Sequence, residues 1–467
     1  MTNKLYYNGK WQDPLHQDTI AVENPATREI IAHVPAASEE EVNLAIEHAA
    51  RALPDWRATP VEKRIELMEK FVTILESRQE KLAEIITSEL GTPVRLALNM
   101  HVRGYLQNIR NDMKIAKTYP WVDEYDGYKV YKESVGVVAC LTPWNYPMGQ
   151  VILKIVPALL AGNVVLLKPS QKTPLVAYEI TKAIDEAGFP AGVFSLLPGR
   201  GAEVGNVLAT HPLVNLVTFT GSTKGGTEVA KLAQDDVKRV VLELGGKSPS
   251  VILEGADLEL ALKRTLDKVF LNTGQTCSAF SRLLVPKSMK EEIEKLACEK
   301  IKNYSVGDPL DKDVRIGPLN GTAQKEKVLK YMNIAKEEGA RLLCGGEYEE
   351  LEGYYFPPTI FTDVDNLSRL AQEEIFGPIL CITEYDGIDE AIRLANETVY
   401  GLSGAVFGPE KEAFHVASNI RAGVLVVNDG KQTTAGPFGG MKHSGYGREG
   451  GIYGFEPFVE LKVIYGE

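Results

Sequence analysis

The spacing of apolar residues predicts where helices and strands lie along this chain. Over residues 38–90, apolar positions recur at intervals of three and four, which predicts helices at 39–53 and 60–90. From Val135 onward, short apolar runs alternate with amphipathic segments. This pattern predicts strands at 135–141, 163–168, 194–198, 216–220 and 239–244, separated by helices at 147–161, 174–187, 203–210 and 222–234.

The alternation begins again after Gly246. It predicts helices at 257–272, 290–304, 323–338, 389–396 and 411–420, with strands at 282–286, 379–385, 404–407 and 423–427. Strands that alternate with helices form mostly parallel sheets with helices on both faces. We therefore expect two α/β domains with a boundary near Gly245, and a length of 467 residues agrees with more than one hydrophobic core.

Two segments stand outside this alternation. Residues 119–134 are strand-like, with tyrosines and valines alternating with charged residues, and residues 458–465 form a predicted terminal strand. Nothing before Val135 carries obvious chemistry.

Composition and charge narrow the classes of function. With 44% apolar and 24% charged residues, the chain is typical of soluble globular proteins. A net charge of −12 argues against nucleic acid and anionic membranes as partners. Residues 1–11 lack the apolar core of a secretory signal, and the most apolar run, 152–167, contains a lysine, an asparagine and a proline, so a membrane span is not expected.

The five cysteines are far apart and form no CxxC pair. That pattern argues against a disulfide framework or a zinc site and favours a reducing cytoplasm. No HExxH motif occurs among the seven histidines, and we expect no metal.

Cys277 is the strongest candidate for a reactive residue. Its neighbours Gly274, Gln275, Thr276 and Ser278 are poor core residues, although an inert buried thiol is the usual state of a cytosolic cysteine. Upstream, Glu243 interrupts the apolar residues 240–242. A partly buried carboxylate has a raised pKa and can accept a proton, whereas a purely structural buried glutamate needs a partner. Together the two residues indicate a thiol nucleophile with a nearby base.

Two glycine-containing loops each follow a predicted strand and precede a predicted helix. The first, 199–205, has GxGxxxG spacing and is a weak match to a dinucleotide-binding loop. In the second, Gly221 permits a close approach of a pyrophosphate, and Ser222 can cap the next helix. Each loop alone could be an ordinary turn, but two in one sheet favour a cofactor. A P-loop ending at Ser248 is excluded because position 241 is valine.

Two further polar residues follow predicted strands. Lys168 stands at the edge where open α/β sheets bind ligands, and it could bond a ribose hydroxyl or be a solvated surface lysine. Asn145 lies in a loop fixed by two prolines. Its amide is suited to stabilise an oxyanion, although a turn-forming asparagine is the simpler interpretation of this segment alone.

Five segments resemble signature segments of the aldehyde dehydrogenase superfamily, in consistent order and over essentially the whole chain. They are 143–147 (PWNYP), 243–249 (ELGGKSP), 270–277 (FLNTGQTC), 374–378 (EIFGP) and 437–449 (PFGGMKHSGYGRE).

The resemblance implies an NAD(P)-dependent, non-acylating enzyme that oxidises an aldehyde to a carboxylic acid. Cys277 attacks the aldehyde, the Asn145 amide and the Cys277 N–H stabilise the oxyanion, and Glu243 activates water to hydrolyse the thioester. The implied cofactor contacts are Trp144, Lys168, Ser170, Gln171, Gly201, Gly221, Ser222, Leu244, Glu374 and Phe376. The implied substrate pocket consists of Tyr146, Gly149, Gln150, Leu153, Thr276 and Ser278.

The resemblance also implies two Rossmann-like domains and a small β element for oligomerisation. We expect the NAD(P)-binding domain at 1–116 and 139–245, the catalytic domain at 246–440, and the oligomerisation element at 117–138 and 441–467. The expected assembly is a homodimer or homotetramer.

One departure from the family pattern affects the cofactor. NAD-specific members commonly have a glutamate three residues after the lysine, where this chain has Gln171. A carboxylate there would repel a 2′-phosphate. Because Gln171 removes that repulsion and Lys172 adds positive charge, we expect NADP to be tolerated beside NAD.

Two other functions remain open. The acylating branch of the family passes the thioester to coenzyme A, but typically lacks the carboxylate at the position of Glu243. An inactive binding or structural homologue is also conceivable, although Asn145, Lys168, Glu243 and Cys277 are all present. The expected pocket has no arginine and no obvious aromatic box for a quaternary amine, which mildly favours medium aliphatic or aromatic aldehydes.

Overall fold

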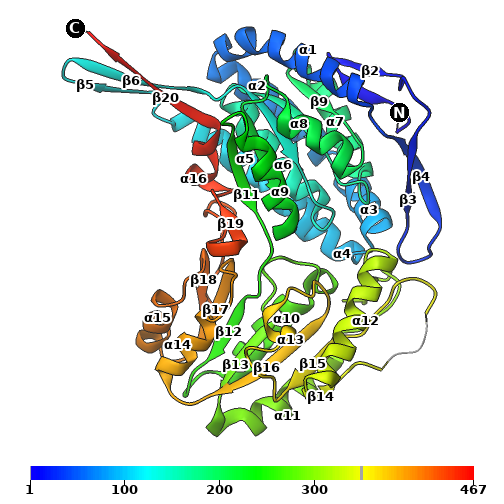
Figure 1. Cartoon of the computed structure of the whole chain (residues 1–467), viewed down its shortest axis with the longest axis vertical. Helices are drawn as coiled ribbons and strands as arrows, with labels where there is room; N and C mark the ends of the chain where they lie inside the picture. Colours follow the sequence, from blue (N-terminus) through cyan, green and yellow to red (C-terminus); the bar gives the residue numbers. More distant parts are fainter. Residues whose placement is uncertain (1, 348–350, 467) are drawn as a thin grey trace.

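The computed structural model of the chain describes residues 2–347 and 351–466. Two α/β lobes lie one above the other, and an arm of antiparallel strands projects from the upper lobe (Figure 1). The expected fold class, with two parallel-sheet units, is confirmed.

The upper lobe contains an eight-stranded sheet. In sheet order its strands are β19 (Gly445–Tyr446), β11 (Arg239–Glu243), β10 (Leu216–Thr220), β7 (Val137–Leu141), β8 (Val164–Lys168), β9 (Phe194–Leu196), β1 (Leu5–Tyr7) and β2 (Lys10–Gln12). Strands β11 to β9 are parallel, while β19, β1 and β2 pair antiparallel at the edges.

Helices surround this sheet, and their apolar faces form one core with it. They are α1 (Glu39–Ala58), α2 (Val61–Glu76), α3 (Gln79–Leu90), α4 (Val94–Leu96), the π-helix η1 (Ala97–Arg103), α5 (Gly104–Thr118), α6 (Pro147–Leu160), α7 (Leu175–Ala187), the π-helix η2 (Gly201–Gly205), α8 (Asn206–Thr210), α9 (Thr223–Gln234), α16 (Gly451–Phe455) and η7 (Glu456–Phe458).

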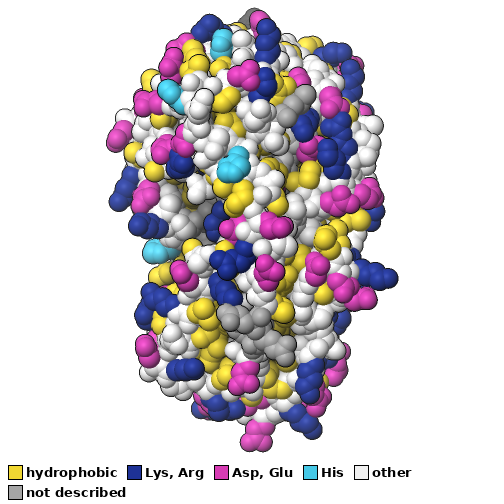
Figure 2. Space-filling model, turned by 90° about the vertical axis from the view of Figure 1, so that its right-hand side faces the viewer, with side chains coloured by type: hydrophobic (Ala, Val, Ile, Leu, Met, Phe, Trp, Pro, Cys, Tyr) yellow, Lys and Arg dark blue, Asp and Glu magenta, His cyan; other side chains and the backbone are white. Residues whose placement is uncertain are grey.

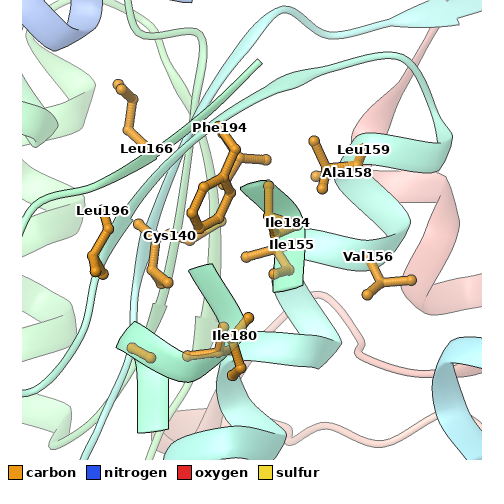
Figure 3. Packing of buried hydrophobic residues seen from close by; sticks show 14 of the residues in the cluster. Cys140, Ile155, Val156, Ala158, Leu159, Leu166, Ile180, Ile184, Phe194 and Leu196 are labelled. Carbon is orange, nitrogen blue, oxygen red and sulfur yellow. The ribbon is translucent and has the colours of Figure 1, made fainter. Parts of the chain in front are cut away.

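The core explains the most apolar segment of the sequence. Residues 152–167 span the end of α6 and most of β8, and every residue of α6 is buried. In Figure 3, Phe194 from β9 lies among Ile155 of α6 and Ile180 and Ile184 of α7, with Cys140 of β7 beside them. Within the described ranges, no helix combines the length and hydrophobicity needed to cross a bilayer.

The lower lobe contains a seven-stranded sheet. Its strands, in sheet order, are β14 (Arg341–Cys344), β15 (Thr359–Thr362), β16 (Ile379–Tyr385), β13 (Arg282–Pro286), β12 (Pro249–Ile252), β17 (Ser403–Phe407) and β18 (Val424–Val427), all parallel except β14. Its helical segments are α10 (Leu258–Phe270), η3 (Leu271–Gly274), η4 (Lys287–Met289), α11 (Lys290–Lys300), η5 (Ile301–Asn303), α12 (Thr322–Glu337), α13 (Arg369–Gln372), α14 (Ile388–Asn396), α15 (Glu410–Ser418) and η6 (Lys442–Ser444).

Side chains of adjacent strand residues enter different cores of this lobe. Ile252 packs with the core of α10 and α11, whereas Val251 packs with that of α14 and α15. The alternation follows from the two-residue period of a strand and places helices on both faces of the sheet.

Two smaller sheets complete the fold. The arm consists of β20 (Val459–Tyr465), β6 (Tyr128–Ser134) and β5 (Val122–Tyr125), and a separate hairpin joins β3 (Thr19–Glu23) to β4 (Ile30–Pro35). On the face shown in Figure 2, acidic and basic side chains are interspersed.

Two parts of the segments that were expected to form an oligomerisation element belong to the large sheet instead. Val137 and Val138, included in 117–138, belong to β7 of the large sheet. Within 441–467, β19 also joins that sheet, because Gly445 adopts a φ of +110° and leaves room for the carbonyl of Leu242, which any side chain would meet.

The helix predicted at 60–90 is two helices. Helix α2 ends at Glu76, and α3 begins at Gln79. Ser77 bonds back to the carbonyl of Ile74, and Arg78 leaves the helical region with φ −120° and ψ 17°. A serine that satisfies a backbone carbonyl in this way competes with the helical ladder.

Candidate functional site

The ends of the parallel strands in the upper sheet meet at one edge. Leu141 lies opposite Lys168 and Phe219, and Thr220 lies opposite Glu243. The strand order reverses between β7 and β10, because β8 and β9 lie on one side of β7 and β10 and β11 on the other. Open α/β sheets bind ligands at such a reversal.

A pocket of about 190 Å³ opens at this reversal and is closed by the lower lobe. Nine of the residues expected in the site line it: Trp144, Asn145, Gln150, Gly221, Ser222, Leu244, Cys277, Glu374 and Phe376. The pocket therefore unites residues from both lobes.

Cys277 follows a backbone segment held in an unusual conformation. Asn272, Thr273 and Gly274 have positive φ angles of 52°, 59° and 73°. Non-glycine residues in this region cost about 1–3 kcal/mol each, and persist only where their surroundings hold them. Here Thr273 donates to the carbonyl of Gly317 at 3.0 Å, and a side chain at position 274 would overlap the backbone of Gly377.

Asn145 is bonded directly to this segment. Its side-chain amide donates to the carbonyl of Gln275 at 3.0 Å, and its own carbonyl accepts from the amide of Asn272 at 2.9 Å. An amide nitrogen carries two hydrogens, so one remains after the bond to Gln275. Asn145 and Cys277 thus line one pocket with their relative position fixed.

The thiol of Cys277 is held in its protonated form. The side chain is partly exposed, and burial, reinforced by the charges of Glu374 and Glu243, raises its pKa to about 12, while Lys268 acts in the opposite direction. Because the thiolate is the nucleophile, reaction at neutral pH requires a group that removes the proton.

Glu243 is a buried carboxyl without a bonding partner. The side chain is 2% exposed, and neither oxygen has a hydrogen-bond partner in the described part of the chain. Burial and the charge of Glu449 raise its pKa, against Lys154 and Arg448, which lower it. Unlike Asn145, Glu243 does not line the pocket, and it lies beside Gly439, where a side chain would meet its Oε1.

A buried ion pair adjoins Glu243. Lys154 of α6 is fully buried and bonds both Glu449 and the hydroxyl of Thr220, the latter at 2.7 Å. Glu449 is therefore neutralised by Lys154, and its second oxygen has no partner among the described residues. Of the two neighbouring carboxyls, Glu449 is therefore paired with Lys154, whereas Glu243 is not paired with a cation in the described part of the chain.

Ser222 and Glu374, two of the residues expected to hold a dinucleotide, line the pocket in positions that suit one. Ser222 caps α9, accepting from the N–H of Gly225 at 3.1 Å, and the positive end of this 12-residue helix faces the pocket. Glu374 accepts from the N–H of Gly246 at 3.0 Å, and a side chain at Gly245 would meet that carboxylate. A helix N-terminus with a nearby carboxylate suits a pyrophosphate and a ribose.

The four remaining expected cofactor contacts do not line this pocket, and Gln171 lines a second cavity together with Lys172. The ammonium of Lys168 donates to the carbonyl of Pro169, and burial lowers its pKa to about 8. Gln171 is exposed, and Ser170 accepts from the N–H of Lys172. Gly201 is exposed, does not line the pocket and begins η2, so the 199–205 loop does not contribute there.

Of the expected substrate residues, Gln150 lines this pocket and the others do not. The hydroxyls of Tyr146 and Thr276 are 2.9 Å apart, and Leu153 and Ser278 are buried. Gly149 is covered by the ring of Tyr105, so it provides space for that ring rather than surface for a substrate.

Two residues of this region were missed by sequence reasoning. His101 of η1 stacks on Tyr146 with ring centroids 4.5 Å apart, and Tyr105 lies one turn further along. Only the i, i+4 spacing of two aromatic side chains could have linked them, and that spacing also occurs in ordinary helices. Among the residues described, no three or more histidine, cysteine or acidic side chains are grouped to hold a metal.

Comparison with known proteins places the chain beside aldehyde dehydrogenases. The profile of the Aldehyde dehydrogenase family matches residues 11–464. The chain is 44% identical to 3-succinoylsemialdehyde-pyridine dehydrogenase of a Pseudomonas species, over 99% of this chain and 98% of that protein.

Solved structures agree. AldC of Pseudomonas syringae, crystallised as a cysteine-to-alanine mutant with NAD+ and octanal, is 40% identical, with a TM-score of 0.98 over 99% of this chain and 96% of that one. Betaine aldehyde dehydrogenase of Staphylococcus aureus, solved with NAD+, is 34% identical, with a TM-score of 0.97 over 99% and 95% of the two chains.

Proposed function

We propose that this chain, which belongs to the aldehyde dehydrogenase family, oxidises aldehydes to carboxylic acids with a nicotinamide dinucleotide as oxidant. The observation that carries the proposal is the placement of the Cys277 thiol and the Asn145 amide in one pocket with the N-terminus of α9. Mixing the protein with an aldehyde and NAD+ and measuring reduced cofactor and carboxylic acid tests it.

The covalent steps take place on Cys277. Its sulfur attacks the aldehyde carbon, and the spare hydrogen of Asn145 and the backbone N–H of Cys277 stabilise the resulting oxyanion. A bound nicotinamide supplies the acceptor for the two electrons and the hydrogen lost from that carbon. The product on the protein is a thioester at Cys277.

Glu243 completes the reaction as a base. In its ionised form it takes a proton from water, the oxygen adds to the thioester carbon, and the acid leaves as the thiol is restored. The same carboxylate can accept the Cys277 proton earlier, a step that solvent water can also perform, whereas hydrolysis of the thioester depends on the carboxylate. Two observations support this role. Neither carboxyl oxygen of Glu243 has a hydrogen-bond partner among the described residues. The pKa of the carboxyl is also raised, as a base that works near neutral pH requires.

Substitution of Asn145 by alanine is expected to lower kcat about a hundredfold, because one oxyanion donor is lost. The mutant also frees the Gln275 carbonyl, so a melting curve must accompany the assay. A fall in kcat with little change in the affinity for aldehyde supports the role. Unchanged kcat contradicts it.

The cofactor preference follows from Gln171 and Lys172. The Lys172 ammonium donates to the Asn320 carbonyl at 2.9 Å and lies 5.0 Å from the ring centroid of Trp144, so its charge is fixed beside the exposed Gln171. We expect turnover with both NAD and NADP. Gln171→Glu should lower kcat/KM for NADP about tenfold more than for NAD, since a carboxylate repels the 2′-phosphate. Strict use of NAD by the wild type contradicts this prediction.

Two alternatives have distinct tests. An acylating enzyme yields a coenzyme A thioester when coenzyme A is supplied, whereas hydrolysis assisted by Glu243 gives free acid with or without it. An inactive homologue reduces no cofactor with any aldehyde and leaves Cys277 unreactive toward iodoacetamide at raised pH, where the thiolate is populated.

The substrate is proposed as a medium aliphatic or aromatic aldehyde. A relative of the chain was crystallised with octanal, and another is named for a pyridine semialdehyde. A panel of aldehydes assayed for cofactor reduction distinguishes these classes.

We propose that the protein forms a homodimer or a homotetramer. We also propose that it is located in the cytoplasm. The arm exposes apolar side chains, with Leu461 68% and Tyr465 78% exposed, and β18 has a free edge in the described sheet. Exposed apolar surface and open sheet edges favour association. Light scattering in solution measures the assembly.

A further inference from the structure

The ring of Tyr105 occupies space that only a glycine at position 149 leaves open. A methyl group on Gly149 would overlap the phenol ring near the carbon that carries the hydroxyl. Tyr105 stands in the first turn of α5, and Gly149 stands in the first turn of α6, one turn after Tyr146. This close contact sets the phenol against the beginning of α6, next to the expected substrate residues.

Among the residues described, no side-chain hydrogen bond involves the hydroxyl of Tyr105, and the side chain is partly exposed. Burial, with the charges of Tyr146, Cys277 and Glu449, raises the pKa of the phenol. It is therefore a permanent hydrogen-bond donor, close enough to Cys277 to respond to its charge. A donor left unpaired beside the nucleophile is available to a ligand.

The surroundings of Tyr105 are rigid. His101 stacks on Tyr146, and the hydroxyl of Tyr146 is 2.9 Å from that of Thr276, the residue before Cys277. His101 is fully buried, both of its nitrogens lack partners in the described chain, and burial lowers its pKa to about 3, so it stays neutral. The aromatic wall is thus uncharged and offers one accessible donor, the Tyr105 hydroxyl.

We propose that Tyr105 is a specificity-determining residue that favours aldehydes with a hydrogen-bond acceptor, a ring nitrogen or a ketone oxygen, away from the reacting carbon. The inference rests on the proposed aldehyde oxidation and names the substrate class of the same site. Aryl aldehydes of this kind place a flat ring against the aromatic wall and an acceptor within reach of the phenol.

The size of the preference follows from the bond involved. Loss of the buried donor leaves the substrate acceptor unpaired, which we expect to lower kcat/KM about tenfold, the equivalent of about 1.4 kcal/mol. When Tyr105 is replaced by phenylalanine, an aldehyde of the same shape without an acceptor loses only its contact with the hydroxyl oxygen.

The experiment compares pyridine-3-carbaldehyde and pyridine-4-carbaldehyde with benzaldehyde, in the full-length wild type and in Tyr105→Phe. Each pyridine differs from benzaldehyde by one ring atom. For each protein we take the ratio of kcat/KM for the pyridine aldehyde to kcat/KM for benzaldehyde. Dividing the wild-type ratio by the mutant ratio cancels the intrinsic reactivity of the aldehydes. We expect this quotient to be about ten for at least one pyridine. Tyr125→Phe, which removes an exposed phenol from β5, is the matched control with an expected quotient of one.

A second mutant keeps the phenol but displaces it. Gly149→Ala should push the Tyr105 ring aside and reduce the preference in the same direction. Quotients below two for both pyridines overturn the proposal, as does an equal loss with all three aldehydes, which would assign the phenol to the oxygen common to all of them. Octanal serves as a fourth substrate: a wild type that oxidises octanal but none of the three aryl aldehydes overturns the inference alone, whereas failure with octanal as well contradicts the proposed function.

Discussion

Substitution of Cys277 by alanine is expected to lower aldehyde oxidation by about four orders of magnitude or more, because the bond to the substrate is formed by its sulfur. The pocket geometry should survive, since the contacts that hold the preceding turn come from Asn145, Thr273 and Gly377 rather than from the thiol. Steady-state reduction of the cofactor measures the loss.

The matched control is Cys298→Ala. Cys298 is also a partly exposed free thiol, but it lies on α11, next to the carbonyl of Leu343. Its substitution should leave oxidation near the wild-type rate. If Cys277→Ala retained turnover, or if both mutants lost it equally, the covalent mechanism would be wrong.

Substitution of Glu243 by glutamine is expected to lower kcat about a thousandfold. Glutamine keeps the size of the side chain but cannot accept a proton from water, so the thioester forms and then persists. Because Glu243 has no hydrogen-bond partner to lose, the fold should tolerate the change. The first turnover should remain faster than later ones, which a rapid-mixing experiment detects as a burst of reduced cofactor.

The pH dependence has a definite sign. Burial and Glu449 raise the pKa of Glu243, so the carboxyl is protonated at low pH and gains its base function as the pH rises through that raised value. The wild-type kcat should therefore increase with pH and then level off, and this increase should disappear in Glu243→Gln. Glu228→Gln, an exposed change on α9, is the control and should keep the wild-type profile. An unchanged profile in Glu243→Gln would exclude this carboxyl as the base.

The sequence predicts the parallel strands well because they are buried on both faces. β10, β13 and β16 have the predicted bounds, and each is almost entirely buried and rich in apolar residues. Strand β12 was missed since it has four residues, begins with Pro249 and depends on its neighbours for pairing. β19 has two residues and becomes a strand only because β11 offers a free edge.

The candidate catalytic residues could be proposed from the sequence for a related reason. Cys277, Asn145 and Glu243 each follow or end an element with a clear pattern, so their types stood out locally. Tyr105 and His101 did not stand out, because their importance arises from contacts with α6, about forty residues away in sequence. The contact of Gly201 with a cofactor stays a prediction, since its glycines suggested a phosphate loop and the structure shows a helical turn there that does not line the pocket.

In the proposed mechanism, the substrate becomes a thioester on the sulfur of Cys277 and the carboxylate of Glu243 promotes its release. Glu243→Gln mixed with benzaldehyde and NAD+, quenched in acid and digested, tests this by mass spectrometry of the peptides. We expect a benzoyl group on Cys277 in a large fraction of the mutant molecules and in few wild-type molecules. An unmodified Cys277 after a measured burst, or a benzoyl group on another residue, would contradict it.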